Sequence, residues 1–369
     1  MEHPRQNQPS PLISPCFQPY STQSPSSSTW VSGAFELKCL EQRCRWVKEE
    51  HVHRSGAPEL MRRTHSVVTP GNHDGVHLGH RALIDAAKRT ANAEGWQTLA
   101  MCFEPHPTAV LVPERAPVLL TGMNRRVELL KGAGCDDVVV LPFDSEFSKM
   151  TPDRFVERVL LDACRAKGVV VGPDFHFGHK RSGNISTLQS WGAREGFTVE
   201  LVQPVMYGGQ AVSSTRLRRI LGDDGNVEDA ALMMTRVHET TGLVTRGDQR
   251  GRELGFPTAN LAAEPLQLPK DGVYAVVARI LDEPGAGLLH GVANLGNRPT
   301  FEAGHSIEVH LLRFEGDLYG KRMRVGFVAR IRGEARFDGL EALRHQIDRD
   351  CDQAKNALQQ MDPELVRWI

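Results

Sequence analysis

Long hydrophobic runs are missing from this chain of 369 residues: none approaches the roughly 20 consecutive apolar residues of a membrane-spanning helix. An excess of basic charge is missing too, because 44 Lys and Arg residues face 45 Asp and Glu residues, giving a formal net charge of −1. A general nucleic-acid-binding protein needs a strongly basic face. We therefore expect neither a membrane nor a nucleic acid as a partner.

Cysteine is also scarce. The seven cysteines are scattered and odd in number, which argues against a disulfide framework. Cys39 and Cys44 have no matching second pair, so a zinc site is not expected there. This usage fits a reducing compartment, and we expect a cytoplasmic location.

Residues 1–60 differ from the rest of the chain. Up to Thr29 they are rich in Ser, Pro and Gln with almost no apolar periodicity, which predicts disorder. The segment lacks the apolar core of a secretory signal, and it has fewer arginines than a transit peptide. We expect a disordered tail over 1–60 and assign no chemistry to it.

Strand and helix patterns alternate from 61 to 222, which we expect to be one domain. Strand–helix alternation with nearly continuous apolar strands predicts an α/β domain with a parallel sheet covered on both faces. Ligands of such sheets bind beyond the carboxyl ends of the strands. The expected strands are 66–69, 98–103, 137–141, 169–171 and 198–202, and the expected helices are 78–93, 125–131, 152–167 and 185–195.

The pattern changes after about residue 222. Residues 223–236 are expected to be a linker, helical at best. Within 237–362, strands separated by Gly, Pro and Asn turns predict an antiparallel sheet or small barrel closed by a final helix, with 363–369 as a tail. The strands expected there are 272–281, 288–293, 306–314 and 322–331, and the helix is 340–360.

The segment G-N-H-D-G-V-H-L-G-H at 71–80 directly follows the first expected strand. Its glycines keep the backbone free of side chains as it turns into a helix, where His77 and His80 share one face. Unpaired N–H groups and the partial positive charge of a helix N-terminus suit a polyphosphate. The alternative is a glycine-rich turn whose histidines make ordinary polar contacts. The strand before, the helix after and the glycine spacing together favour nucleotide binding.

Three later segments follow strands at the same predicted edge: E-P-H-P at 104–107, V-G-P-D-F-H-F-G at 171–178 and S-S-T-R-L-R at 213–218. Ser214 or Thr215 could cap a short helix whose amides hold phosphate. Each segment alone is more often a plain turn or helix start. Their order and placement indicate convergence on the loop at 71–80.

A second glycine-rich segment lies at 247–260. Gly251 and Gly255 permit a backbone wrapped closely around phosphates. Thr258 and Asn260 offer two neutral oxygens on one side of an extended segment, where Mg²⁺ could bind while keeping its waters. The alternative is a Gly/Pro hairpin with an Asn turn. Glu308, between Ile307 and Val309, is by periodicity an outward-facing strand residue.

These segments, in this order, resemble the prokaryotic bifunctional riboflavin kinase/FAD synthetases. The resemblance runs from Val67 to the end of the chain, and G-R-E-L-G-F-P-T-A-N at 251–260 matches the most distinctive riboflavin kinase motif. Further matching segments lie at 271–274, 291–301, 307–310 and 317–320. The resemblance implies a Rossmann-like nucleotidyltransferase domain followed by a β-barrel riboflavin kinase domain with a C-terminal helix.

The resemblance also implies site residues. Glu308 would be the general base of riboflavin phosphorylation, and His77, His80 and Arg218 would act in transfer of AMP from ATP to FMN. Thr258 and Asn260 would hold Mg²⁺. The implied ATP-binding residues are Gly71, Asp74, Gly79, Ser214, Thr215 and Arg216 in the first half and Gly251, Arg252, Gly255 and Thr258 in the second. The implied flavin-binding residues are Pro107, Asp174 and Phe175 in the first half and Asn294 and Arg298 in the second.

The substrates and products implied are riboflavin, FMN, FAD and ATP, with Mg²⁺ as cofactor. One departure is His73, where the family usually has an aromatic residue. A polar, titratable ring there motivates an alternative, an active kinase with a non-catalytic or altered nucleotidyltransferase-like half. Transfer to another acceptor, or from CTP, is disfavoured because the kinase half makes FMN. Oligomeric state stays open, with at most weak homo-oligomerisation expected.

Overall fold

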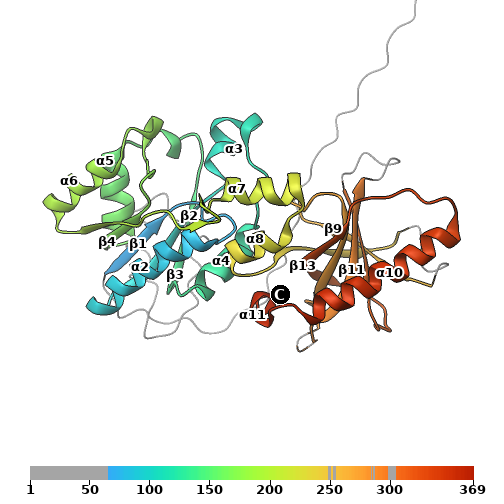
Figure 1. The fold of residues 1–369 in the computed structure, drawn as a ribbon. Helices are drawn as coiled ribbons and strands as arrows, with labels where there is room; N and C mark the ends of the chain where they lie inside the picture. The colour runs from blue at the N-terminus through green and yellow to red at the C-terminus, as the bar shows by residue number, and fades with distance from the viewer. Residues whose placement is uncertain (1–64, 248–250, 252–254, 284, 286, 298–304) are drawn as a thin grey trace, which may run out of the picture. The chain divides into compact units, whose positions relative to one another are not determined.

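The computed structural model describes residues 65–247, 251, 255–283, 285, 287–297 and 305–369. The tail expected over 1–60, together with Arg252 and Arg298, lies outside these residues. All the described residues belong to one compact unit, Leu40–Ile369. Figure 1 shows a parallel sheet with its helices and then a barrel with a long helix.

A five-stranded sheet in the order β3-β2-β1-β4-β5 forms the first half, and each of its strand pairs is parallel. The parallel sheet predicted from the alternating pattern is therefore confirmed. The strands are β1 (Ser66–Pro70), β2 (Gln97–Glu104), β3 (Asp137–Pro142), β4 (Ala166–Val171) and β5 (Thr198–Leu201).

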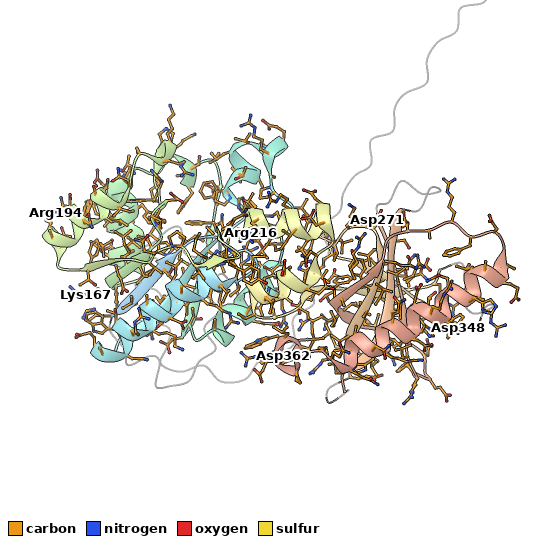
Figure 2. The ribbon with its side chains drawn as sticks, viewed as in Figure 1. Lys167, Arg194, Arg216, Asp271, Asp348 and Asp362 are labelled. Carbon is orange, nitrogen blue, oxygen red and sulfur yellow. The ribbon has the colours of Figure 1, made fainter. Side chains whose placement is uncertain are left out.

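Helices cover both faces of this sheet. Successive strand residues point to opposite faces, so neighbouring residues pack against different helices. Val67 packs with alanines of α2 (Leu78–Glu94). Its neighbour Val68 packs with residues of η5 (Phe155–Ala163), which continues from α5 (Pro152–Arg154), and with residues of α6 (Ile185–Glu195). Side chains fill the space between the sheet and its helices (Figure 2). Further helical segments are α3 (Pro107–Leu111), η3 (Pro113–Arg115), α4 (Met123–Gly132), η4 (Phe147–Lys149) and η6 (His179–Arg181).

The first helix begins and ends where its sequence directs. His77 caps its N-terminus by accepting a hydrogen bond from the backbone N–H of Gly79. Gly95 ends it in the left-handed conformation, with φ of 69°, which glycine adopts without steric cost. Its buried residues, Ile84, Ala86, Ala87 and Ala91, recur at helical spacing.

The second half is a closed antiparallel barrel in the order β10-β11-β12-β9-β8-β13. The outer faces of β10 and β11 pack against α10, where Ala354 and Leu358 contact the strand residues Ala275 and Val277 as part of one cluster. The elements are β8 (His238–Thr245), β9 (Ala259–Ala263), β10 (Gly272–Ile280), β11 (Leu289–Asn297), β12 (His305–Leu311), β13 (Arg322–Arg332), α10 (Leu340–Gln359) and α11 (Pro363–Val366).

The segments between and after the two halves are packed. The expected linker contains α8 (Val227–Met234), and Met233 and Met234 are fully buried in the core cluster that fills the barrel. The residues expected as a tail include α11, and Trp368 lies against Gly132 of α4. Before α8 come the hairpin β6 (Met206–Tyr207) and β7 (Gln210–Ala211), then α7 (Ser214–Arg219) and η7 (Ile220–Asp224). None of the helices within the described ranges has the length and apolar character to cross a membrane.

Candidate active sites

The loop at 71–80, which follows β1, has an unusual backbone. His73, Gly75 and Val76 have positive φ values of 48°, 85° and 41°. Positive φ is strained for a β-branched residue such as Val76, which is fully buried. The conformation therefore depends on its surroundings, among them a hydrogen bond from the backbone N–H of Gly75 to Oγ1 of Thr121 at 2.9 Å.

Asp74 organises the elements around this loop. Its carboxylate, 3% exposed, accepts hydrogen bonds from the backbone N–H groups of Leu120 and Thr121 at 3.0–3.1 Å. It also pairs with Arg126 at 3.3 Å and with Arg218 at 2.5 Å. Protein donors thus occupy both oxygens, and the carboxylate holds Arg218 in place beside the cavity that both residues line.

His77 and His80 form a stacked pair, with ring centroids 3.6 Å apart and an interplanar angle of 20°. Nδ1 of His77 accepts the backbone N–H of Gly79 at 3.2 Å, and Nδ1 of His80 accepts the backbone N–H of His77 at 3.3 Å. A neutral ring whose Nδ1 accepts carries its hydrogen on Nε2. The main chain thus fixes both rings as Nε2–H donors. Gly79 leaves room for the first ring, because a Cβ there would lie 3.1 Å from Cε1 of His77.

Burial keeps these histidines neutral. It lowers the pKa of His77 to about 3, and neighbouring His73 adds to the effect. Burial likewise holds the pKa of His80 well below 6.5, and His77 is the next largest cause. At neutral pH the pair therefore offers hydrogen-bond donors without positive charge. Positive charge is supplied by Arg218, which lines the same cavity as His80. Its Nε also donates to the carbonyl of Val118 at 2.6 Å.

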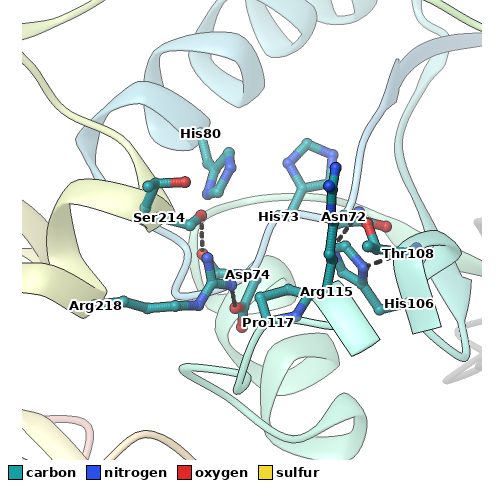
Figure 3. A pocket seen from close by; sticks show the side chains of 11 residues that line it. Asn72, His73, Asp74, His80, His106, Thr108, Arg115, Pro117, Ser214 and Arg218 are labelled. Carbon is teal, nitrogen blue, oxygen red and sulfur yellow. Dashed lines mark hydrogen bonds and ion pairs between the residues drawn. The ribbon is translucent and has the colours of Figure 1, made fainter. Parts of the chain in front are cut away.

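A cavity of about 350 Å³ lies beside the loop (Figure 3). Its volume is at the lower end of the range of small-molecule sites, about 300–1,000 Å³. Figure 3 shows Ser214 and Arg218 of α7 on one side of Asp74 and Asn72, His106 and Thr108 on the other. The lining residues are Asn72, His73, Asp74, His80, His106, Thr108, Arg115, Pro117, Ser214, Thr215 and Arg218.

Two of the three expected segments therefore converge on the loop, the one at 104–107 and the one at 213–218. The third does not line this cavity: Asp174 is exposed, and Phe175 stacks on Phe177 with centroids 5.6 Å apart. Arg216 lies on another side of α7, where Nη1 donates to the carbonyls of Tyr207 and Gln210 at 2.8 Å (Figure 2). Other expected residues outside the lining set are Gly71, His77, Gly79 and Pro107.

The residues expected for the kinase site form a row across three strands of the barrel. Glu308 of β12 pairs in register with Asn260 of β9 on one side and with Asn294 of β11 on the other. Their neighbours Ala259, Ala293 and Val309 belong to the core inside the barrel. Because side chains alternate across a strand, the row Asn260–Glu308–Asn294 faces outward.

The backbone before β9 passes close to Asn260 and Thr258. A Cβ on Gly247 would collide with the amide of Asn260, so the main chain passes directly over that side chain. A Cβ on Gly251 would collide with the carbonyl of Phe256 and lie 3.2 Å from Oγ1 of Thr258. Gly255 has a φ of 87°. Gly247 and Gly251 thus let the main chain approach Asn260 and Thr258 closely.

Comparison with known proteins follows the same division. Residues 60–216 match the family model described as FAD synthetase, and residues 234–358 match the one described as riboflavin kinase. The chain is 39% identical over 286 residues to the bifunctional riboflavin kinase/FMN adenylyltransferase of Escherichia coli K12, covering 77% of this chain and 90% of that protein. It is 38% identical over 291 residues to the Pseudomonas fluorescens protein of the same name, covering 78% and 92%.

The chain belongs to the bifunctional riboflavin kinase/FMN adenylyltransferase family. A solved structure also resembles it, a Streptococcus pneumoniae protein described as a macrolide-efflux protein. It has a TM-score of 0.72 and 29% identity, and the alignment covers 82% of this chain and 95% of that one. The membership suggested by the sequence motifs is confirmed.

Several lining residues of this family member's first cavity were not singled out from the sequence: Asn72, His106, Thr108, Arg115 and Pro117. For His106 a signal existed, since it lies inside the motif at 104–107 beyond β2. Its Nε2 lies 2.9 Å from the side-chain nitrogen of Asn72. Arg115 is the last residue of η3 and does not follow a strand, so the strand-edge rule could not find it.

Proposed function

We propose that the chain carries out two consecutive ATP-dependent transfers on one flavin. Riboflavin is phosphorylated to FMN with release of ADP, and FMN is then adenylylated to FAD with release of pyrophosphate. The observation that carries the second activity is the cavity that gathers His80, Ser214, Thr215 and Arg218 at the carboxyl edge of the FAD synthetase-like half. The names of the bifunctional relatives favour this function over a kinase with an inert first half.

In adenylyl transfer, a phosphate oxygen of FMN attacks the α-phosphorus of ATP, and the bond to the β-phosphate breaks. No protein nucleophile is needed, so the site acts by positioning and by neutralising charge. Arg218, oriented by Asp74, supplies the positive charge. His80 donates a hydrogen bond from Nε2, and the hydroxyls of Ser214 and Thr215 belong to residues that line the same cavity.

In the kinase half, we assign Glu308 as the base that accepts the proton of the ribityl 5′-hydroxyl as that oxygen attacks the γ-phosphorus. In phosphoryl transfer the hydroxyl loses its proton late, as the new bond to phosphorus forms. A carboxylate of ordinary basicity can therefore act as the base. The register places Glu308 directly beside Asn260. Asn294, on its other side, is exposed and is assigned to flavin, together with Arg298 outside the described residues.

Thr258 and Asn260 are assigned to Mg²⁺. Two neutral oxygens suit a cation that keeps several waters and takes its remaining ligands from nucleotide phosphates. The close passage of Gly247 and Gly251 beside these side chains leaves backbone rather than side-chain atoms around them. When bound, Mg²⁺ neutralises the phosphate charge that develops during transfer. Gly251 and Gly255 are assigned to the nucleotide phosphates on the same argument.

The remaining parts of the proposal concern organisation. We assign adenylyl transfer to 61–222 and phosphorylation to 237–362, joined by 223–236; the family matches at 60–216 and 234–358 support the two larger units. Because both reactions consume ATP, the expected cytoplasmic location is retained. Small molecules are the proposed partners, with no nucleic acid or membrane and at most weak self-association.

Product analysis by chromatography tests both activities in one experiment. With riboflavin, ATP and Mg²⁺, FMN should appear first and FAD after it; with FMN supplied, FAD and pyrophosphate should appear together. FMN that accumulates without FAD, even when FMN is supplied, would establish the kinase-only alternative. Absence of both products would reject the assignment.

A further inference from the structure

Arg236 belongs to the barrel side of the chain but contacts the nucleotide loop. It lies between α8 and β8, its side chain is 1% exposed, and Nη1 donates to the carbonyl of Gly75 at 2.8 Å. A second, longer contact of 3.4 Å joins Nη1 to the carbonyl of Met234. The two bonded residues, Arg236 and Gly75, are 161 positions apart in the chain.

Gly75 lies at the strained point of the loop. Its own φ is 85°, and the next residue, buried Val76, has a φ of 41°. The N–H of Gly75 is held by Thr121 and its carbonyl by Arg236, so both polar groups of this residue are fixed. Two residues further on, His77 caps α2 and stacks on His80. Strained backbone persists only where the surroundings over-determine it, and Arg236 is one of these constraints.

The charges around Arg236 come from both halves. Burial lowers the pKa of Arg236 to about 10, Glu239 of β8 and Asp74 oppose this, and Arg125 and Arg81 add to it. The guanidinium therefore stays charged at neutral pH. Glu239 in turn pairs with Arg125 of α4 at 2.5 Å.

The residue after Arg125 reaches the loop from the other side. Arg126, 1% exposed, donates to the carbonyl of Asn72 at 3.1 Å and pairs with Asp74. Contacts from Arg236 and from Glu239 of β8 thus reach the loop at two places, at Gly75 directly and at Asn72 through α4. The direct contact is the simpler to test.

We propose that Arg236 is a positioning residue for adenylyl transfer, supplied by the barrel side of the chain. By holding the carbonyl of Gly75 it fixes the turn that places His77 against His80 and orients His80 toward the cavity. The adenylyl-transfer site is then complete only when the segment entering the barrel is docked against the loop. This inference rests on the proposed function of that cavity.

The test uses the full-length chain with Arg236→Met, which keeps much of the side-chain volume but removes the donor, and Arg236→Lys, which keeps the charge. FAD formation from FMN and FMN formation from riboflavin are measured on the same preparations, each with kcat and KM for ATP. A hydrogen bond from a charged donor predicts that kcat/KM for adenylyl transfer falls about 10- to 100-fold in Arg236→Met. Kinase activity should stay within about twofold, and Arg236→Lys should recover part of the loss.

The matched control is Arg332→Met. Arg332 pairs with buried Asp350 within the barrel at 2.8 Å, so its loss also removes a guanidinium from a buried pair. It should leave adenylyl transfer within about twofold of wild type, since it touches no residue of the loop. If Arg236→Met does not fold, as judged by its melting temperature, Arg236→Lys tests the proposal instead. The quantity compared is then its ratio of FAD formation to FMN formation, relative to wild type.

A double-mutant cycle separates positioning from general stabilisation. If Arg236 acts through the loop, Arg236→Met combined with His80→Ala should cost less than the sum of the two single losses in kcat/KM. Additive losses, an equal fall in both activities, or an unchanged rate of FAD formation would overturn the inference. Wild-type protein that makes no FAD would instead refute the proposed function itself.

Discussion

Replacing Asp74 by Asn should damage both the stability of the sheet half and its adenylyl transfer. The carboxylate is 3% exposed and pairs with Arg126, which is 1% exposed. Removing one partner of a buried pair costs about 3–5 kcal/mol, because the remaining charge stays buried without compensation. Asn keeps one oxygen for the backbone N–H groups of Leu120 and Thr121, so we expect about 3 kcal/mol.

The same substitution releases Arg218 from its 2.5 Å contact with the carboxylate. A hydrogen bond between charged groups contributes about 1.5–3 kcal/mol, which corresponds to a fall of about 10- to 150-fold in kcat/KM for FAD formation. Urea unfolding gives the first quantity and initial rates of pyrophosphate release give the second. Riboflavin phosphorylation by the same preparation should be little changed.

Asp350→Asn is the matched control. Asp350 is 2% exposed. It accepts a bifurcated hydrogen bond from Nε of Arg332 at 3.0 Å, one from Nη2 of Arg332 at 2.8 Å and one from Gln346 at 2.7 Å, so the chemical change is of the same kind in the other half. It should cost similar stability and leave adenylyl transfer intact. The reasoning is refuted if Asp74→Asn unfolds within about 1 kcal/mol of wild type, or if its loss of FAD formation equals that of Asp350→Asn.

Three further predictions concern single side chains. His80→Ala should lower FAD formation by at least about tenfold through loss of its Nε2–H donor while sparing the kinase, and a large fall in FMN production would contradict the assignment. Asn260→Ala should abolish FMN formation but leave FAD formation from supplied FMN intact; equal loss of both would argue against separate sites. Burial lowers the pKa of His73 to about 4, so between about pH 6.5 and 4 the unfolded chain takes up a proton that the folded chain does not. Stability should therefore fall as the pH is lowered, and His73→Phe should reduce the difference in unfolding free energy between pH 7 and pH 5 by about 2 kcal/mol in urea titrations.

Apolar periodicity was sufficient to predict the sheet half. Its strands are buried on both faces and read as continuous apolar runs, for example Val138–Val140 in β3. The rule that ligands bind beyond the carboxyl ends of parallel strands then brought 104–107 to the loop. The segment 213–218 also reaches the loop, but it follows the antiparallel hairpin β6–β7 rather than a strand of the parallel sheet. For 171–178 the rule gave the correct edge, but the turn directs Phe175 onto Phe177 and leaves Asp174 in solvent.

The barrel was predicted less completely. Two of its six strands, β8 and β9, were not expected. β8 contains three threonines and a glycine, and β9 is only five residues long, so neither shows a clear apolar alternation. They become strands because β12 and β13 pair with them and close the barrel. The buried helix α8 was missed as core for a related reason: its partners lie in the barrel, far away in sequence.

Contacts across long sequence separations were the least predictable part of the site. Nothing in the neighbouring sequence marks Arg236 or Arg126 as residues that hold the loop. Each donates to a backbone carbonyl of the loop at 71–80, and every residue type has such a carbonyl. His73 is different. Its Nε2 lies 2.9 Å from the carbonyl of Thr69, which gives the polar ring a local partner in an otherwise buried position. A histidine ring can therefore occupy this place, where the family usually has an aromatic residue.

The helix α7 shows what the motif could have predicted and did not. Because Ser214, Thr215 and Arg216 all lie within the motif S-S-T-R-L-R at 213–218, the resemblance suggested that all three bind ATP. Successive helical residues are rotated by about 100°, so Arg218 shares a face with Ser214 and Thr215, whereas Arg216 points about 200° away from Ser214. The structure follows this arithmetic: Arg218 lines the cavity, and Arg216 holds the β6–β7 hairpin. A motif therefore identifies the element at a site, and the helical period within it identifies which of its side chains line the cavity.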